Sequence, residues 1–273
     1  MSLSICRQPF ANRMTTLTIS LPQIQLFLFI FLRVSAMTLT VPVFDSRNIP
    51  PVFKIGLCFT ITLVLYPIIR LEPVAFAPSV IPFVVGIACE ILIGVITGFL
   101  IRLIFTSIQL AGELAAFQMG FSVASVIDPM SSSQVPVISE LIYMFAILIF
   151  LTTNAHHWVL RALVESFTLI PPFGFHSSGA LMARLTQAAG EMFVIAVKTG
   201  SPVIVSLLLV SLGLGLVGRT VPQMNVFMVA TPVNILIGFL FLSLSLPMMM
   251  TFLSQLLNGL GKEILQIMKL MGP

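Results

Sequence analysis

The sequence predicts an all-α protein of about six long hydrophobic helices, some of them broken hairpins, of the kind found in membranes. Composition is the first reason: of 273 residues, 58% are hydrophobic and 8% are charged, whereas soluble domains carry about 25% charged residues. The second is that the few charges stand singly between long apolar runs. The third is that small residues recur every fourth position, which is a helical and not a strand period.

Each predicted helix is a stretch with few or no charges, because a membrane-spanning helix needs about 20 apolar residues. The first begins at Met14 and, interrupted only by Arg33, continues to Phe44. A signal peptide is the competing interpretation, but the run exceeds the roughly 7 to 15 apolar residues of a signal sequence. The other predicted helices lie at 55–69, 73–101, 141–160, 192–217 and 226–253.

Several classes of function find no support in the residues. The Lys and Arg residues form no basic stripe and no nucleic-acid-binding motif, so we expect no nucleic-acid partner. Cys6, Cys58 and Cys89 are odd in number and have no paired spacing, which argues against a disulfide framework or a zinc site. We therefore expect neither a metal ion nor another cofactor.

Catalytic motifs are equally weak. His156 and His157 are adjacent, so on a helix they point about 100° apart and cannot face one metal ion. The segment 120–124 (GFSVA) lacks the last glycine of a Gly-x-Ser-x-Gly motif. No glycine-rich phosphate loop is present. The sequence thus indicates a protein that is not an enzyme.

Two stripes with a spacing of four residues predict places where helices touch closely. Packing within the chain and packing against other subunits are both open. Arg33, Glu90 and Lys198 must each extend to the interface, pair with another group or face water, because a charge in hydrocarbon costs about 2.5–3.5 kcal/mol. The stripes comprise Gly86, Glu90, Gly94, Gly98, Gly112, Ala116, Gly120 and Ala124.

A polar segment interrupts the apolar runs in the middle of the chain. Asp128-Pro129 predicts a helix end, and the serines that follow predict a turn. Irregular backbone of this kind cannot face lipid, so it lies outside the bilayer, inside protein or against a water-filled passage. An ordinary loop and a closing plug are both possible. The residues of the predicted plug are Phe117, Met119, Phe121, Asp128, Pro129, Met130, Ser131, Ser132, Ser133, Gln134 and Pro136.

Three segments in the same order resemble a known family. They are FLRVSAMTLTVPVFDSRNIPPVFKIGL from residue 31, QMGFSVASVIDPMSSSQVPVISELIYMFAILIFLTTNAHHWVLRALVESF from residue 118, and LGLVGRTVPQMNVFMVATPVNILIGF from residue 214. Together they resemble the flagellar biosynthetic protein FliR family. The residues that carry the resemblance are Arg33, Asn154, His156, Trp158, Ser166, Arg219, Pro222, Gln223 and Asn225.

The chain departs from the family pattern in two places. Ala155 stands where the family often has glycine, and residues 1–15 extend beyond the usual start. A virulence-type secretion homologue is the neighbouring possibility, but such proteins tend to lack the segments seen here at 154–158 and 222–225. The flagellar member is therefore favoured.

The resemblance implies a single export-gate domain over residues 1–273, with an N-terminal extension (1–15), a plug-like region (107–137) and a C-terminal helix (254–273). It implies a FliP-like N-terminal part and a FliQ-like C-terminal part. The expected location is the bacterial inner membrane at the flagellar basal body. Expected partners are FliP, FliQ, the nearby FlhB and FlhA, unfolded flagellar export substrates and membrane lipid.

In that setting the two stripes would be contacts with other subunits, and the plug residues would close the passage. The alternative is a self-contained secondary transporter that uses Glu90, Asp128 or Lys198 for coupling.

Overall fold

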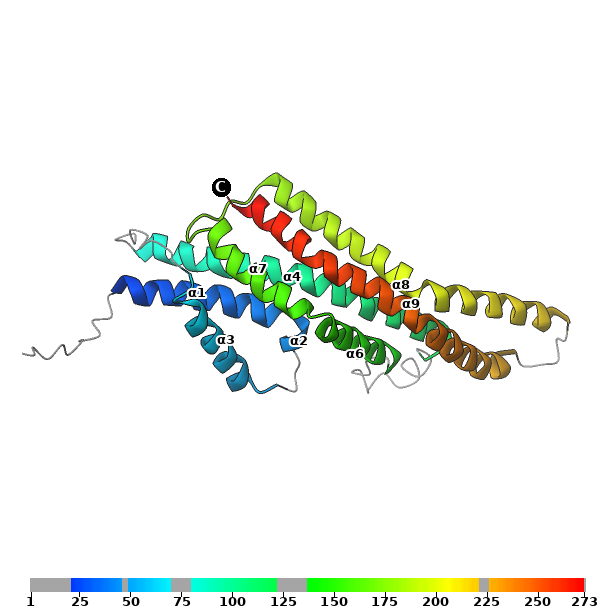
Figure 1. Cartoon of the computed structure of the whole chain (residues 1–273). Helices are drawn as coiled ribbons and strands as arrows, with labels where there is room; N and C mark the ends of the chain where they lie inside the picture. The colour runs from blue at the N-terminus through cyan, green and yellow to red at the C-terminus, as the bar shows by residue number, and fades with distance from the viewer. Residues whose placement is uncertain (1–20, 46–48, 70–79, 122–136, 221–225, 273) are drawn as a thin grey trace, which may run out of the picture.

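The computed structural model describes residues 21–45, 49–69, 80–121, 137–220 and 226–272, and every regular element in these ranges is a helix. This confirms the predicted all-α class. In chain order the helices are α1 (Leu21–Thr40), α2 (Pro42–Asp45), α3 (Pro51–Leu65), α4 (Val80–Met119), α6 (Val137–Thr152), α7 (Ala155–Leu169), α8 (Gly179–Thr220) and α9 (Val226–Met271), as Figure 1 shows.

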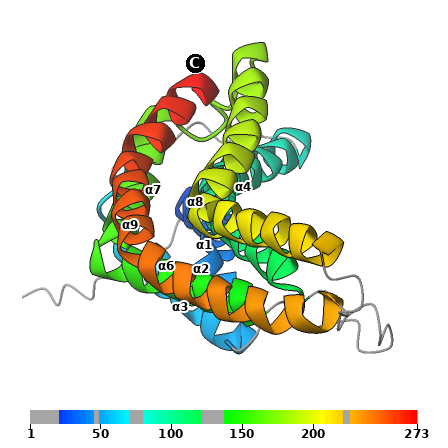
Figure 2. The ribbon, with the colours of Figure 1, turned by 90° about the vertical axis from the view of Figure 1, so that its right-hand side faces the viewer.

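Helix α4 is the central element, and α1, α6, α8 and α9 all pack against it. It is apolar on nearly all sides, which is typical of a helix surrounded by other helices. Helices α8 and α9 lie side by side as a hairpin that extends beyond the end of α4 (Figure 1). Both bend, as the end-on view in Figure 2 shows. Prolines at 202, 232 and 247 lie inside these two helices, and an interior proline bends a helix.

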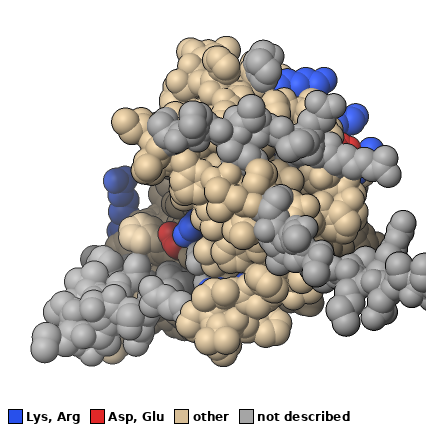
Figure 3. All heavy atoms as spheres, turned by 90° about the vertical axis from the view of Figure 1, so that its left-hand side faces the viewer, with Lys and Arg blue, Asp and Glu red and all other residues tan. Residues whose placement is uncertain are grey.

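Within the described ranges, α1, α4, α8 and α9 are long and apolar enough to cross a membrane. The bent pair α6 and α7 makes a fifth candidate if it is counted as one span. Helix α3 has 15 residues, fewer than the roughly 20 that a span needs. The predicted count of about six was therefore approximate. Figure 3 shows one end of the molecule, where charged side chains are sparse among uncharged ones.

The apolar run 141–160 does not form the single helix that we predicted. It is divided between α6 and α7, which meet at an angle of 67°. Asn154 has φ 55° and lies between them, and asparagine accepts this left-handed conformation more readily than most residues. The hydroxyl of Thr153 donates to the carbonyl oxygen of Ile149 at 2.7 Å, a local bond of the kind that competes with helix continuation.

Other boundaries differ because helices run past the predicted runs. Helix α4 begins at Val80 and continues to Met119, well beyond residue 101. Residues 254–271, expected as a C-terminal helix, are the continuous last part of α9. Charged residues in these extensions, such as Arg102 and Lys262, are exposed. They therefore do not end the helix.

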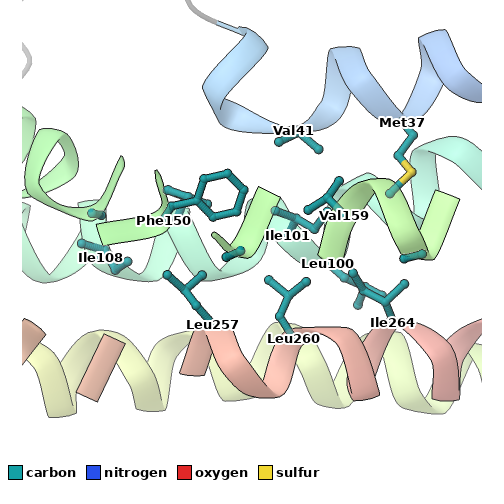
Figure 4. Packing of buried hydrophobic residues seen from close by; sticks show 14 of the residues in the cluster. Met37, Val41, Leu100, Ile101, Ile108, Phe150, Val159, Leu257, Leu260 and Ile264 are labelled. Carbon is teal, nitrogen blue, oxygen red and sulfur yellow. The ribbon is translucent and has the colours of Figure 1, made fainter. Parts of the chain in front are cut away.

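One hydrophobic core joins α4 to the helices around it (Figure 4). The close contacts of this cluster hold α4 against the surrounding helices, because many weak van der Waals contacts add up. The cluster draws side chains from α1, α3, α4, α6, α7, α8 and α9. The side chains labelled in Figure 4 are Met37, Val41, Leu100, Ile101, Ile108, Phe150, Val159, Leu257, Leu260 and Ile264.

A buried ion pair fixes α1 to α4. The side chains of Arg33 and Glu90 are each 1% exposed, and Arg33 Nε donates to Glu90 Oε2 at 2.5 Å. Arg33 Nη2 donates to the other carboxylate oxygen at 3.0 Å, which makes the pair bidentate. In the structure, Arg33 and Glu90 are each other's partner.

The same guanidinium also holds the end of α7. Its Nη1 donates to the carbonyl oxygen of Ser166 at 2.8 Å, and its Nη2 donates to that of Ile170 at 3.0 Å. The guanidinium carbon lies 4.2 Å from the centre of the Phe167 ring. Cations are favoured at the carbonyl end of a helix and over aromatic faces. Arg33 therefore connects three helices, and we call Arg33, Glu90, Ser166, Phe167 and Ile170 the arginine hub.

The small residues of α4 are the places where neighbouring helices come closest. A Cβ added to Gly94 would lie 2.7 Å from the carbonyl oxygen of Arg33, and one added to Gly98 would lie 2.6 Å from Cβ of Thr40. A Cβ on Gly112 would lie 2.7 Å from Cα of Ser139. Helices α1 and α6 thus cover the glycine face of α4.

For the two stripes, packing within the chain and packing against other subunits were both open, and several of the described positions contact segments of the same chain. Gly86, the first of them, faces the Phe173 ring, which an added Cβ would approach to 2.3 Å. Glu90 belongs to the arginine hub, and Ala116 is 1% exposed. The spacing of four did indicate close helix contact, but the contact is made by helices of the same chain.

The arginine hub gives a first prediction. Replacing Glu90 by alanine leaves a buried guanidinium without its counter-charge, which costs about 3–5 kcal/mol. The double replacement Arg33→Met with Glu90→Met removes both charges and should recover part of that loss. Thermal unfolding of the purified full-length chain in detergent measures both. The control is Glu165→Ala, which removes the exposed pair Arg161–Glu165 and should cost less than about 1 kcal/mol. Equal losses for Glu90→Ala and Glu165→Ala would contradict the hub.

Close packing gives a second prediction. Gly94→Ala places a methyl group against the backbone of α1, so α1 must move and the chain should lose stability. Gly56→Ala in α3 is the control, because nothing lies within 4 Å of a Cβ there and alanine favours a helix over glycine by about 1 kcal/mol. Unfolding temperatures of the two variants should shift in opposite directions, and a stable Gly94→Ala variant would count against the packing.

Candidate functional site

The last turn of α4 is the part of the predicted plug region that the structure describes. Gly120 has φ +92°, its N–H donates to the carbonyl oxygen of Phe117, and the N–H of Phe121 donates to that of Ala116, both at 3.1 Å. These two bonds form a Schellman motif, in which glycine supplies the left-handed residue after the helix. Helix α4 therefore ends at Met119, and the small-residue stripe does not continue through Gly120 on that helix as we had expected.

The three bulky residues of the predicted plug point in different directions. Phe117 is 67% exposed and Phe121 is 38% exposed, whereas Met119 is fully buried. Residues two apart on a helix point about 200° apart, so Phe117 and Met119 cannot share a face. This end of α4 thus carries two exposed aromatic rings and one internal anchor, and the role of the three residues in a plug stays a prediction.

Met119 anchors the end of α4 to the hairpin. Its side chain occupies the notch left by Gly238 of α9, where an added Cβ would lie 2.6 Å from Cγ of the methionine. Beside it, the Phe121 ring meets the Phe239 ring edge-to-face, with centres 6.5 Å apart, a favoured aromatic geometry. The tip of α4 is therefore bound to α9 through side chains on both sides of Gly120.

An exposed apolar ridge follows the same end of α4. We define it as Leu114, Phe117 and Phe121, each at least a third exposed. Glu113, also exposed, lies beside Leu114. An exposed aromatic side chain is unremarkable when isolated, but a contiguous group is typical of a binding or constriction surface.

Both flanks of the segment 122–136 are held on α4. On the incoming side, Phe121 follows the Schellman motif directly. On the outgoing side, the Ser139 hydroxyl donates to the carbonyl oxygen of Gln109 at 3.0 Å, and Ser139 faces Gly112. Gly112 and Met119, the last residue of α4, are seven positions apart, or about 10 Å along the helix. Asp128 and the other predicted plug residues from Pro129 to Pro136 lie outside the described residues, as does Ala124.

The motif residues Asn154, His156 and Trp158 surround the bend between α6 and α7. Asn154 supplies the left-handed turn, and the His156 ring lies 6.3 Å from that of Phe150. Trp158 packs over Gly261 of α9, where an added Cβ would lie 2.9 Å from Cε3 of the indole. This motif therefore builds a corner and attaches it to α9.

The remaining motif residues fall in three places. Arg33 and Ser166 belong to the arginine hub. Arg219 is exposed in the last turn of α8, where a cation favours the helix end. Pro222, Gln223 and Asn225 lie outside the described residues.

Sequence reasoning did not single out Phe173. Its φ is 68°, and its ring fills the space over Gly86 and meets the Phe29 ring edge-to-face at 5.3 Å. A phenylalanine with positive φ is strained, and nothing in the segment Pro171-Pro172-Phe173-Gly174 distinguishes that conformation from an ordinary turn. Glu90 had been assigned to subunit packing, and its pairing with Arg33 depends on the fold.

Within the described ranges, no group of three or more His, Cys, Asp or Glu side chains could hold a metal ion. The arrangement at the end of α4 is apolar, with exposed rings, a buried anchor and flanks fixed by packing.

Known proteins are similar to this chain over most of its length. A family model described as bacterial export proteins, family 1, matches residues 24–260. The chain is 38% identical over 222 residues to the flagellar biosynthetic protein FliR of Bacillus subtilis (strain 168), covering 79% of this chain and 84% of that protein. It is 31% identical over 236 residues to FliR of Escherichia coli (strain K12), covering 86% and 89%.

FliR of Pectobacterium carotovorum subsp. carotovorum is 33% identical over 233 residues, covering 85% of this chain and 88% of that protein. The range that the family model matches includes the arginine hub, the end of α4 and the bend at Asn154. The family match covers most of the chain, and the fold consists of helices of membrane-spanning length. The chain belongs to the FliR family of bacterial flagellar export proteins.

Proposed function

We propose that the chain is a non-enzymatic core subunit of the flagellar type III protein export gate. It forms part of the conduit for unfolded export substrates, and the end of α4 with the segment 122–136 forms part of its closing plug. Its partners are FliP and FliQ in one hetero-oligomeric gate, with FlhB and FlhA nearby. The gate lies in the bacterial inner membrane at the flagellar basal body.

The observation that carries this proposal is the length of the exposed apolar surface on α4. Exposed large apolar side chains occur from Val80 to Phe99 and again at Leu114 and Phe117. Val80 and Phe117 are about 55 Å apart along the helix. The hydrocarbon core is about 30 Å thick, and a tilt of 40° still leaves about 42 Å. Exposed Arg102 and Glu113 lie between the two groups, so lipid alone cannot cover both.

Partner chains are the natural cover for the second group. Leu114 and Phe117 lie on the side of Arg102 and Glu113 away from the residues 80–99, which are themselves about 30 Å long and match a bilayer. A ridge placed beyond these charges has either water or protein beside it. Exposed rings at the end of a central helix favour protein: neighbouring subunits around a closed passage, with adaptable apolar contact to the exported chain.

The proposed closure of the passage is supported by the flanks of the segment 122–136. Phe121 and Ser139 are both bonded to α4, at Ala116 and at Gln109. Asp128, the serines 131–133 and Gln134 give this segment its polar character. We assign to it, together with Phe117 and Phe121, the task of keeping the gate closed to ions between export events.

Removing the rings should make the assembled gate leak. In the double variant Phe117→Ala with Phe121→Ala, the apolar side chains that narrow the passage are lost while the Met119 anchor stays. Passive ion conductance of membranes that contain the gate, co-expressed with FliP and FliQ, should rise clearly above that of the unchanged protein. Deleting 130–134 should act in the same direction.

The matched control for the leak is Phe193→Ala. Phe193 is 58% exposed on α8, so this variant removes a comparably exposed ring at a distance from the end of α4. It should leave the conductance unchanged. An unchanged conductance in the double variant, with the gate assembled normally, would refute the role of the ridge.

Dependence on partners separates a gate subunit from a self-contained transporter. A transporter should purify as a functional unit by itself, whereas a gate subunit should be inert alone and should co-purify with FliP and FliQ. A photoreactive amino acid at position 117 should crosslink to a partner subunit in the assembled gate. Transport by the isolated chain in vesicles, without partner crosslinks, would favour the transporter.

A further inference from the structure

Helices α7 and α9 lie side by side and run in the same direction. Trp158 of α7 packs on Gly261 of α9, where an added Cβ would lie 2.9 Å from Cε3 of the indole. Eleven positions later in both segments, a Cβ added to Gly272 would lie 3.0 Å from the carbonyl oxygen of Leu169. In Figure 2 the two helices form one side of the molecule, and α4 and α8 form the other. The outer face of α7 and α9 is therefore distinct from the exposed side of α4.

Two lysines of α9 stand on this outer face without a counter-charge. Lys262 and Lys269 are exposed and lie seven positions apart, which is two helical turns or about 10 Å. Gly261 faces α7, and the lysines point about 100° and 80° around the helix from it, in the same sense. Neither ammonium group forms a hydrogen bond or an ion pair with the residues that the structure describes. Both charges are therefore available to a group outside the described part of the chain.

Helix α7 adds an aromatic and charged flank to the same side. Arg161 lies about 60° around α7 from Trp158, in the opposite sense to the lysines, so on parallel helices the cations project to one side. The Arg161 side chain is 67% exposed, and its Nε donates to Glu165 Oε1 at 2.8 Å. Its guanidinium carbon lies 5.7 Å from the centre of the Trp158 ring, and Trp158 is 41% exposed. We call Trp158, Arg161, Lys262 and Lys269 the basic face.

The carboxylates of α8 and α9 point away from the basic face. Glu263 is two positions after Gly261, so it points about 160° away from the side that faces α7. Together with Glu191 of α8 it bonds Arg184, whose side chain is 14% exposed. These three side chains join α8 to α9 on the side opposite α7. Both carboxylates are engaged there by an arginine, and the two lysines of the basic face stay unpaired within the described residues.

The basic face lies at the depth of residues 80–99 of α4, whose exposed apolar side chains match a bilayer. Leu260 of α9 faces Leu100 of α4 (Figure 4), and Phe173, which follows α7, lies on Gly86. The basic face lies between these two contacts. A charged side chain is costly in hydrocarbon and faces water or other protein instead. Lipid therefore does not cover the basic face, and the exposed indole favours a protein contact over open water.

We propose that the basic face docks an acidic segment of a partner polypeptide. Carboxylates two helical turns apart would pair with Lys262 and Lys269, and charge complementarity of this kind selects the partner and its register. Trp158, held in place by α9 and Arg161, supplies a rigid aromatic contact. Tryptophan and arginine are enriched among the residues that dominate interfaces. The proposal goes beyond the closing role of the ridge and shares with it only the position of the bilayer.

Site-specific crosslinking tests the proposal in membranes of cells that co-express the full-length chain with FliP, FliQ, FlhB and FlhA. A photoreactive amino acid replaces Gln266, which is exposed and lies between the two lysines on α9. It should crosslink to a polypeptide, within about four residues of an Asp or Glu, which is one helical turn. The double variant Lys262→Glu with Lys269→Glu should lower the crosslink yield about tenfold or more, because like charges then meet. Replacing the identified carboxylates by lysine in the same cells should restore it.

Two controls separate docking from a general loss of structure. Lys262→Arg with Lys269→Arg keeps both charges and should leave the yield within about twofold. Lys198→Glu makes the same charge reversal at an exposed lysine of α8 and should leave the yield unchanged. All variants should elute from size-exclusion chromatography at the volume of the unchanged protein, since the substituted side chains are exposed.

Several results would overturn the proposal. They are the absence of a polypeptide crosslink, a crosslink to phospholipid, a crosslink to a segment without acidic residues, and a yield that survives the double charge reversal. None of these measurements reads ion conductance. A failure here is therefore distinguishable from a failure of the closing role proposed for the ridge.

Discussion

The buried guanidinium of Arg33 is the interaction on which the arrangement of α1, α4 and α7 depends. A charge in this apolar interior persists only with a complete set of partners. Glu90 supplies the counter-charge, and the carbonyl groups at the end of α7 supply the remaining acceptors. The hub therefore fixes the register of three helices at one point, whereas apolar packing alone would tolerate sliding. Buried polar contacts have been found to specify a unique arrangement in this way in other helical proteins.

Glycine contacts extend this register along α4. From Gly86 through Gly94 and Gly98 to Gly112, the face of α4 that lacks side chains receives Phe173, α1 and α6 in turn. Close backbone approach brings many weak contacts into play, and their sum is large. The arginine hub lies within this series, so polar and apolar contacts specify the same positions. Helix α4 is consequently a rigid axis, and its end presents the apolar ridge in a fixed direction.

The sequence predicted helices wherever charge is absent over many residues, because that signal is local. It could not predict that Arg33 pairs with Glu90, which is 57 positions away, because only the fold brings the two together. The spacing of Gly94 and Gly98 showed that something packs closely, without showing that α1 does so. The break at Asn154 was missed because residues 141–160 contain no Asp, Glu, Lys or Arg, so the absence of charge runs unchanged across it. Gly120 was placed in a stripe, although a glycine followed by a change of pattern is also the signal of a helix end.

The notch at Gly238 has a mechanical consequence. Met119 fills that notch, and Phe117 lies two positions earlier on the same turn of α4. Any rotation of this turn that swings the Phe117 ring around the helix axis must also withdraw the methionine from α9, because one backbone carries both side chains. The tip of α4 and α9 are therefore mechanically coupled: the last turn of α4 cannot rotate unless α9 moves at Gly238, and a displacement of α9 there is transmitted to Phe117.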